Sequence, residues 1–416
     1  MAIPATDHAT NGRQSRLTRS QALRSFPQHF FAPFRSFHIN PSRDSRVSTA
    51  ASHTEASHTA ASHTAAPLRI FRARSGPAEG QPIEMENVDC PNCGPLQYET
   101  VRHETVIVAE DGLTHLGGTF RIVRCRECQL AFTNPRPTAG SLEQFYPADY
   151  SPHFEKEPAE HAHGRWKGRL ELALLRQYYG YPPQPAGGMT ALASLAGRIV
   201  IRRARARERW IPFRAPGRLL DFGCGAGEFV KQMLEYGWNA EGLDFSPRMV
   251  EVLRQKGEFR AHLGTLPHPD IPAGSLDALT MWHALEHVPF PQQILRAAAD
   301  ALRRRGVLGI TVPNFDSWSR RRFQGDWFGL ALPRHLTHFT PSTLRRMVEG
   351  AGFRVLLLEQ VGRDGWIRKS ARALAVIERK TSRLTRLRSK ALAAVVARWT
   401  ELTGQADSYR LVAERR

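Results

Sequence analysis

Four of the five cysteines stand in two C-x-x-C pairs, C-P-N-C at 90–93 and C-R-E-C at 125–128. Each pair presents two thiolates from one turn, and four soft ligands complete the tetrahedral coordination that Zn²⁺ prefers. A filled coordination sphere has no position for water, so we expect a structural zinc ion. An iron–sulfur cluster or a redox dithiol is the alternative that the spacing leaves open. The predicted metal ligands are Cys90, Cys93, Cys125 and Cys128.

A glycine-rich loop, D-F-G-C-G-A-G at 221–227, follows an apolar run and precedes a helical pattern. Glycines at such a place allow a tight turn and let a ligand approach the N–H groups of a helix start. A nicotinamide-type loop needs G-x-G-x-x-G, but Glu228 stands in its last place. Asp221 precedes the first glycine by two residues, where a carboxylate would repel a pyrophosphate and attract a cation. We expect Cys224 to be a small loop residue.

A second acid, Asp244, ends the next predicted strand, twenty-one residues after Gly223. A carboxylate at that place can accept hydrogen bonds from both hydroxyls of a ribose. Together with Asp221 it suits a nucleoside that carries positive charge. S-adenosylmethionine, with its ammonium and sulfonium groups, is such a ligand.

The glycine loop and Asp244 resemble those of the class I S-adenosylmethionine-dependent methyltransferases, over about residues 215–362 plus the last strand. The resemblance implies that the glycine loop contacts the methionine part of the cofactor and that Asp244 contacts the ribose. Adenine would lie against the segment G-T-L after the third strand, although an acid common in relatives is missing there. The implied cofactor-binding residues are Asp221, Gly223, Gly225, Gly227, Asp244, Phe245, Thr265, Leu266 and Trp282.

The segment M-W-H-A-L-E-H-V at 281–288 contains an H-x-x-E-H pattern like that of some zinc peptidases. The sequence P-F-P follows at once, so no long helix can continue through the pattern. We therefore expect a loop at the end of a strand, in the cofactor crevice. The resemblance implies that His283 lies near the methionine end, while Glu286 and His287 order the loop. Quinone-pathway relatives can hold a divalent ion here with two acids and a histidine, but His283 replaces the first acid.

The segment R-H-L-T-H-F-T at 334–340 follows the fifth predicted strand. It resembles an E-H-L-x-x-F-S element of sugar C-methyltransferases, in which the histidine is a general base. The resemblance implies His335 as the base, with Arg334 at the place of the family's glutamate. An imidazole with a pKa near 7 suits this task, and methyl transfer otherwise needs mainly positioning. A structural histidine is the alternative for His335, and we expect His338 to be structural.

These groups must be positioned by alternating strands and helices. Between residues 218 and 362, five apolar runs separated by helical patterns predict βαβ units and a parallel sheet. The segment S-Y-R-L-V-A-E-R at 408–415 predicts a final strand. The predicted fold is α/β: a Rossmann-like, seven-stranded methyltransferase sheet, with a small β-rich zinc module and a disordered tail at the N-terminus.

The start of the chain is rich in Ser, Thr, Arg, Ala and Pro and repeats A-S-H-T three times. It also resembles a transit peptide, and Met85 is an alternative start. The expected domains are a disordered extension over 1–84, the zinc module over 85–150, a helical linker region over 151–214, and a class I methyltransferase domain over 215–416 with a basic helical insertion at 363–404.

The charge of the chain is strongly positive, with 58 Lys and Arg against 39 Asp and Glu and a net charge of +19. It indicates an acidic partner or, alternatively, only a basic solvated surface. Residues 363–398 hold eleven of these cations against two acids, with apolar residues near helical spacing. Such helices either rest on an anionic membrane surface or are solvated. We expect a cytoplasmic protein, with peripheral membrane contact as an option.

These observations predict an S-adenosylmethionine-dependent methyltransferase that acts on a small molecule: a sugar, lipid-linked glycan, polyketide or quinone. Zinc modules of this pattern resemble those preceding many bacterial small-molecule methyltransferases. An RNA methyltransferase is the second hypothesis, but W-H-A-L-E-H replaces the proline–aromatic motif usual after the fourth strand, so nucleic acid is not the expected partner. A non-catalytic zinc-binding interaction protein is the third, and the intact glycine loop with Asp244 speaks against it.

Overall fold

The computed structural model describes part of the 416-residue chain, and all of this part belongs to the second of two compact units, which starts at Pro67. The predicted extension, up to residue 81, and nearly all of the predicted helical linker lie outside the described residues. The described ranges are 82–95, 103–111, 117–146, 179–181, 210–214, 217–377 and 382–416.

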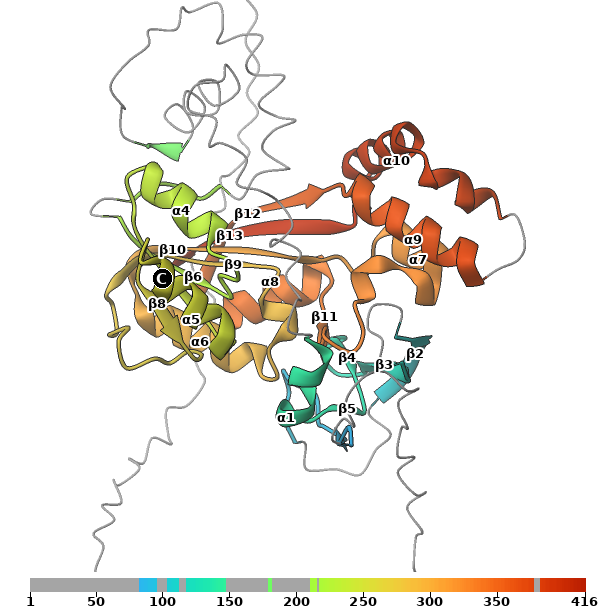
Figure 1. Cartoon of the computed structure of the whole chain (residues 1–416), viewed down its shortest axis with the longest axis horizontal. Helices are drawn as coiled ribbons and strands as arrows, with labels where there is room; N and C mark the ends of the chain where they lie inside the picture. Colours follow the sequence, from blue (N-terminus) through green and yellow to red (C-terminus); the bar gives the residue numbers. More distant parts are fainter. Residues whose placement is uncertain are drawn as a thin grey trace, which may run out of the picture. The chain divides into compact units, whose positions relative to one another are not determined.

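A seven-stranded sheet has the order β12-β13-β10-β9-β6-β7-β8 (Figure 1). Neighbouring strands from β10 to β8 pair in parallel, whereas β13 pairs antiparallel with both β10 and β12. This order with one reversed strand confirms the predicted methyltransferase sheet. The strands are β6 Arg218–Phe222, β7 Asn239–Asp244, β8 Ala261–Leu263, β9 Leu276–Trp282, β10 Leu302–Pro313, β12 Phe353–Val361 and β13 Ser408–Arg415.

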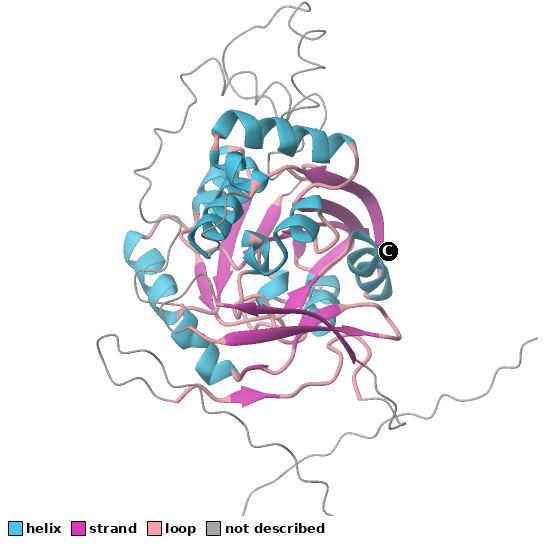
Figure 2. Ribbon diagram, turned by 90° about the vertical axis from the view of Figure 1, so that its right-hand side faces the viewer, coloured by secondary structure: helices cyan, strands magenta, loops and turns pink. Residues whose placement is uncertain are grey.

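Helices cover both faces of this sheet, as a parallel sheet requires (Figure 2). One core joins strand residues to α4 and α5, and another joins the opposite strand residues to α6 and α8. Three of the helices begin with proline, whose fixed φ suits the first turn. The bounds are α4 Glu228–Glu235, α5 Pro247–Lys256, α6 Pro291–Ala301 and α8 Pro341–Gly350.

The cysteine-containing segment forms a second sheet of four strands in the order β11-β4-β3-β2. Its edge strand β11, Thr337–His338, comes from the methyltransferase part of the chain and pairs antiparallel with β4. The two parts are thus hydrogen-bonded to each other. The remaining elements are β1 Met85–Glu86, β2 His103–Glu110, β3 Thr119–Cys125, β4 Ala131–Thr133, β5 Arg136–Pro137, α1 Ala139–Leu142 and the 3₁₀ helix η1 Glu143–Phe145.

A helical insertion separates β12 from β13 and packs on α7 (Figure 1). Its buried residues join those of α7 and of the cysteine-containing segment in a third core. No described helix has the length and apolar composition that crossing a membrane requires. The elements are α7 Trp318–Phe323, η3 Gln324–Asp326, η4 Phe328–Leu330, α9 Asp364–Ile377, η5 Arg383–Arg388 and α10 Lys390–Leu402.

Candidate active site

The glycine loop turns sharply between β6 and α4. Gly223, Gly225 and Gly227 all have positive φ, of 72°, 52° and 77°. A side chain at Gly223 is also excluded by space, because its Cβ would lie 2.7 Å from the Cβ of Ala284. Gly227 is the N-cap of α4, so the loop leads directly into a helix N-terminus. The backbone therefore has the geometry that the predicted cofactor loop needs.

Both predicted acids are buried at the ends of adjacent strands. Asp221 accepts a hydrogen bond from the Thr280 hydroxyl at 2.6 Å. Asp244 accepts the backbone N–H groups of Gly225 at 2.9 Å and Ser246 at 3.0 Å, so it holds the glycine loop in place. Burial raises the pKa of Asp244, while these two N–H groups oppose the shift. A carboxylate oxygen can accept more than one hydrogen bond, so these contacts do not prevent Asp244 from accepting a ligand hydroxyl.

The other predicted cofactor residues divide into exposed and buried side chains. Phe245 is 48% exposed, and Thr265 is exposed as well. Leu266 and Trp282 are buried in the two cores of the sheet, and the Trp282 ring lies 5.4 Å from that of Phe229. The side chains of Leu266 and Trp282 thus serve packing, whereas Phe245 and Thr265 present surface next to Asp244.

The H-x-x-E-H segment forms a loop with one 3₁₀ turn, η2 Leu285–His287, which confirms the prediction of a loop in place of a long helix. His283 has a left-handed φ of 55°. Arg363 donates to its Nε2 at 3.5 Å, so Nδ1 carries the proton and donates to Glu286 Oε1 at 3.1 Å. The imidazole ring also lies 5.4 Å from the Trp366 ring. His283 thus connects the loop to the start of α9.

Glu286 is completely buried. Burial raises the pKa of its carboxyl group to about 8, so Glu286 is mostly neutral at pH 7. Among the described residues its Oε2 atom has no hydrogen-bond partner. The Glu286 carboxyl group therefore lies, mostly neutral, within the histidine group formed by His283, His287 and His335.

His335 is buried 4.0 Å from Glu286, measured between Nε2 and Oε1. Its Nδ1–H donates to the carbonyl of Gly329 at 3.0 Å, which leaves the lone pair on Nε2. Burial and the nearby His287 and His338 lower the pKa of His335 well below its usual value. The predicted pKa near 7 is therefore too high: His335 is neutral, and it is a weaker base than an exposed imidazole.

His287 contacts both the loop of His335 and the cysteine-containing segment. Its Nδ1 lies 3.1 Å from the carbonyl of Arg334 and 2.8 Å from the hydroxyl of Tyr146. Burial lowers the pKa of His287 to about 4. The Tyr146 ring also lies 5.7 Å from that of Phe245. Tyr146 therefore bridges the residue after Asp244 and the histidine group.

Tyr146, Arg363 and Trp366 were not predicted from the sequence. Tyr146 follows η1, and the other two begin the insertion, so each is far in sequence from the histidines it contacts. His338, in contrast, is buried and lies 3.2 Å from the Thr133 hydroxyl in the shared sheet.

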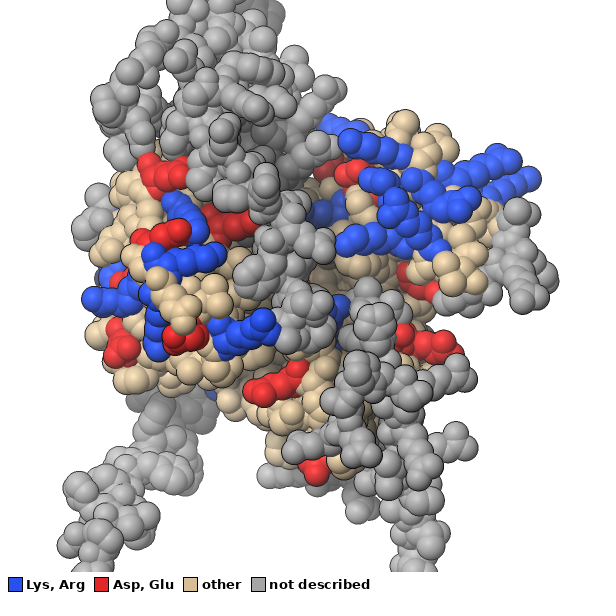
Figure 3. Space-filling view, in the orientation of Figure 1, with Lys and Arg blue, Asp and Glu red and all other residues tan. Residues whose placement is uncertain are grey.

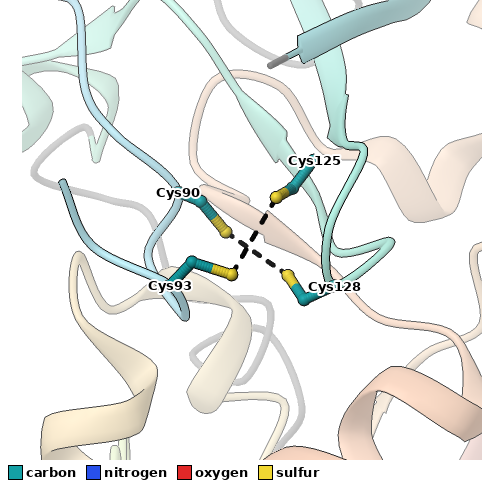
Figure 4. A group of neighbouring side chains, drawn as sticks. All are labelled: Cys90, Cys93, Cys125 and Cys128. Atoms are coloured by element: carbon teal, nitrogen blue, oxygen red, sulfur yellow. Dashed lines mark hydrogen bonds between the residues drawn. The ribbon is translucent and has the colours of Figure 1, made fainter. Parts of the chain in front are cut away.

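Three groups of described side chains have the spacing of metal ligands, and one of them is His262, His268 and Asp270. The four cysteines converge on one point (Figure 4), with Sγ atoms 3.5 Å apart for Cys90 and Cys128 and 4.0 Å apart for Cys93 and Cys125. A tetrahedral zinc ion with Zn–S bonds of about 2.3 Å sets its sulfurs about 3.8 Å apart, so these residues fit zinc. The ligand atoms of Glu286, His287 and His335 also lie within 4.8 Å of one another.

Cys224 stands apart from the four converging cysteines. It is buried in the glycine loop, and burial raises the pKa of its thiol well above the usual value. A side chain on Gly242 would come within 2.7 Å of its Sγ atom. A neutral thiol in such a packed place is unreactive, in keeping with the small loop residue predicted.

Replacing Glu286 with glutamine should change the pH dependence of stability. The folded pKa of about 8 exceeds the unfolded value of 4.5, so the contribution of the proton to stability is complete below pH 4.5 and is lost as the pH rises to about 8. Between about pH 7 and pH 8 the wild type should lose about 1 kcal/mol, and Glu286→Gln, which mimics the neutral acid, should lose none. Urea unfolding at both pH values measures this difference. The exposed Glu251→Gln variant is the control, and parallel losses in all three proteins would contradict the prediction.

Comparison with known proteins agrees with this geometry. Residues 157–358 match the family model of a methyltransferase domain. A ubiquinone biosynthesis O-methyltransferase of Xanthomonas oryzae pv. oryzae is 35% identical over 106 residues, which cover 24% of this chain and 44% of that protein. A protein of the same name from Xanthomonas axonopodis pv. citri is 28% identical over 153 residues, 34% of this chain and 64% of that protein. The chain thus spans less than two thirds of either relative.

A solved S-adenosylmethionine-dependent methyltransferase from Archaeoglobus fulgidus is similar over 54% of this chain and 97% of its own, with 22% identity and a TM-score of 0.35. The family model spans the glycine loop, Asp244 and the histidine group, and the sheet has the strand order expected from the sequence. Residues 157–358 thus match a methyltransferase domain, and the strand order of the sheet agrees with the class I S-adenosylmethionine-dependent fold that the sequence predicts.

Proposed function

We propose that this chain transfers a methyl group from S-adenosylmethionine to a small-molecule acceptor of the sugar, lipid-linked glycan, polyketide or quinone type. One observation carries the proposal: the buried histidine group adjoins the glycine loop. Ala284, between His283 and Glu286, lies so close to Gly223 that a Cβ there would come within 2.7 Å of the Ala284 Cβ. A cofactor on the glycine loop would therefore lie beside groups able to accept a proton.

The residues of the crevice divide the work. Asp244 would hold the ribose, the N–H groups of the glycine loop would face the methionine end, and Phe245 would offer its exposed ring to the adenine. Asp221, kept in place by Thr280, would oppose the positive charge of the ligand. The cofactor supplies a methyl group that is already activated by the sulfonium, so the protein needs mainly to align the acceptor.

The reaction also releases one proton from the acceptor as its new bond to the methyl carbon forms. The Nε2 lone pair of His335 would take this proton, because its Nδ1–H is held by Gly329. The buried carboxyl group of Glu286, 4.0 Å away, would help to orient the imidazole. Because burial disfavours the charged imidazole, the proton must leave through neighbouring groups after each turnover.

The acceptor class is supported by the surroundings of the histidines and by the relatives. Aromatic rings of Tyr146 and Trp366 border His287 and His283. Such walls suit a flat or ring-shaped molecule. Two relatives carry the name of ubiquinone biosynthesis O-methyltransferases. The alternatives are an RNA acceptor and a non-catalytic zinc-binding role, and the tests below distinguish them from the proposed function.

A structural zinc ion completes the proposal. The four cysteines fit tetrahedral zinc in number, atom type and spacing. Two of them, Cys90 and Cys125, are buried in the same core as residues of the large sheet. The ion would hold β3 and the C-x-x-C pair at 90–93 against that core. Its role would be to stabilise the fold around Tyr146.

Calorimetric titration of the full chain with S-adenosylmethionine tests the proposal. We expect saturable binding with one ligand per chain, and no binding of the dinucleotide NAD, because the acid before the glycine loop repels a pyrophosphate. A folded chain that fails to bind S-adenosylmethionine would contradict both the cofactor and the activity.

Replacing His335 with alanine should lower the rate of methyl transfer by a factor of about 10²–10⁴, the usual contribution of a general base. Its side chain contacts no residue of the glycine loop in the described hydrogen bonds, so the affinity for S-adenosylmethionine should stay within about twofold of wild type. The measurement is transfer of a radiolabelled methyl group to the catechol protocatechuate. Unchanged turnover in a folded His335→Ala protein would assign the histidine a structural role.

A further inference from the structure

The outward face of α10 is apolar. Leu392 is 47% exposed, Val395 67%, Trp399 43% and Leu402 71%. Their spacing of three, four and three residues places all four on one side of a helix. A helix that faces only water normally presents charged and polar residues on that side, so these residues indicate a contact outside the described chain.

The opposite side of α10 is already occupied. Ala393 and Ala397 are buried in the third core, and Thr400 is buried with its hydroxyl bonded to the carbonyl of Ala397. Packing thus sets the rotation of the helix about its axis. The apolar face cannot turn inward without breaking these contacts, and no described residue covers it fully.

Positive charge surrounds this apolar face. Figure 3 shows Lys and Arg gathered over α9 and α10. Within the described residues of 364–402, eight cations stand against two acids, Asp364 and Glu401, and Glu401 is already paired with Arg398. The eight cations are Arg368, Lys369, Arg372, Arg383, Arg386, Arg388, Lys390 and Arg398.

We propose that the insertion docks on an anionic phospholipid bilayer, with the apolar face of α10 in the interface and the cations of η5 and α9 at the headgroups. An amphipathic surface helix binds in this way through buried apolar area plus attraction to acidic lipids. A second copy of this chain would bring the same cations together, and RNA would leave Val395 and Leu402 in water. A bilayer satisfies both the charge and the apolar side chains.

Docking here also connects the membrane to the site of the proposed function. The same insertion supplies Arg363 and Trp366, which contact His283 at 3.5 Å between nitrogens and 5.4 Å between rings. An acceptor dissolved in or anchored to the bilayer would approach the site along α9. This last step rests on the proposed function, whereas vesicle binding does not depend on it.

Flotation of the full chain with vesicles tests the proposal. We use vesicles of phosphatidylcholine alone and vesicles of equal parts phosphatidylcholine and phosphatidylglycerol. Binding is expected only to the mixed vesicles and should weaken with salt. The charge variant Arg383→Gln with Arg386→Gln and Lys390→Gln should lower the affinity roughly a hundredfold, since each cation near such a surface contributes about fivefold. The apolar variant Val395→Ser with Leu402→Ser should lower it about tenfold or more.

Controls separate this surface from the rest of the basic chain. Lys256→Gln with Arg304→Gln removes two exposed cations outside the insertion and should bind like wild type. If the charge variant binds as well as wild type, the docking surface lies elsewhere and the proposal is wrong. It is also wrong if light scattering finds a dimer that Val395→Ser with Leu402→Ser dissociates. Retained binding of S-adenosylmethionine shows that each variant is folded, so failure here leaves the proposed function intact.

Discussion

Replacing Asp244 with alanine is expected to weaken the binding of S-adenosylmethionine by a factor of about 10² to 10⁴. Two hydrogen bonds from the ribose to a charged acceptor would be lost, each worth about 1.5–3 kcal/mol. The substitution also frees the N–H of Gly225, which Asp244 accepts at 2.9 Å, so the glycine loop loses its anchor. Calorimetry on the full chain measures the change.

The matched control is Asp300→Ala, which removes an exposed carboxylate from α6. It should bind S-adenosylmethionine like wild type. A thermal unfolding scan distinguishes a local loss of affinity from general unfolding. If a folded Asp244→Ala protein binds S-adenosylmethionine within about threefold of wild type, the ribose does not contact Asp244. The expected orientation of the cofactor would then be wrong.

Replacing Cys125 with serine is expected to remove the metal and destabilise the chain. We expect one zinc ion per chain in the wild type, by atomic emission, and little in the variant, because serine is a poor zinc ligand at neutral pH. Cys125 is buried with Cys90 against residues of the large sheet, so loss of the ion would loosen that core as well. If the free energy of unfolding falls by about 5 kcal/mol, the melting temperature should fall by roughly 10–20 °C.

The control for this experiment is Cys224→Ser, which changes the one described cysteine outside the metal-ligand group. It should keep a full zinc content. If the wild type instead contains iron and absorbs visible light, the four cysteines hold an iron–sulfur cluster and not zinc. Full zinc content in Cys125→Ser would contradict the four-cysteine site altogether.

The fold was predictable because its signals are local. Most strands of the large sheet contain a short apolar run, although β8, Ala261–Leu263, does not, and glycines with positive φ mark the turn after β6. The C-x-x-C pairs are likewise a local signal, because each pair brings two sulfur atoms together within four residues. Apolar runs, glycine turns and paired cysteines are each required by the local backbone, so they can be recognised in the sequence.

The surroundings of the histidines were not predictable in the same way. Tyr146 and Trp366 reach them only because the cysteine-containing segment and the insertion pack around one loop, and no periodicity indicates that packing. The pKa of His335 has the same origin: residue type predicts a base near neutrality, but burial next to other imidazoles lowers this pKa. The resemblance implies a cofactor contact at Leu266, whose side chain is buried, and this contact stays a prediction.

Because β4 pairs with β11, the cysteine-containing segment and the methyltransferase domain should evolve together. The carbonyl of His335 accepts the Thr133 hydroxyl at 2.9 Å, and the N–H of Thr133 donates to the carbonyl of Leu336 at 3.0 Å. A recombination that exchanged the first part of the chain for a relative's would change the partner strand of the very segment that carries His335. We therefore expect a chimera of two relatives to fold best when β4 and β11 come from the same parent.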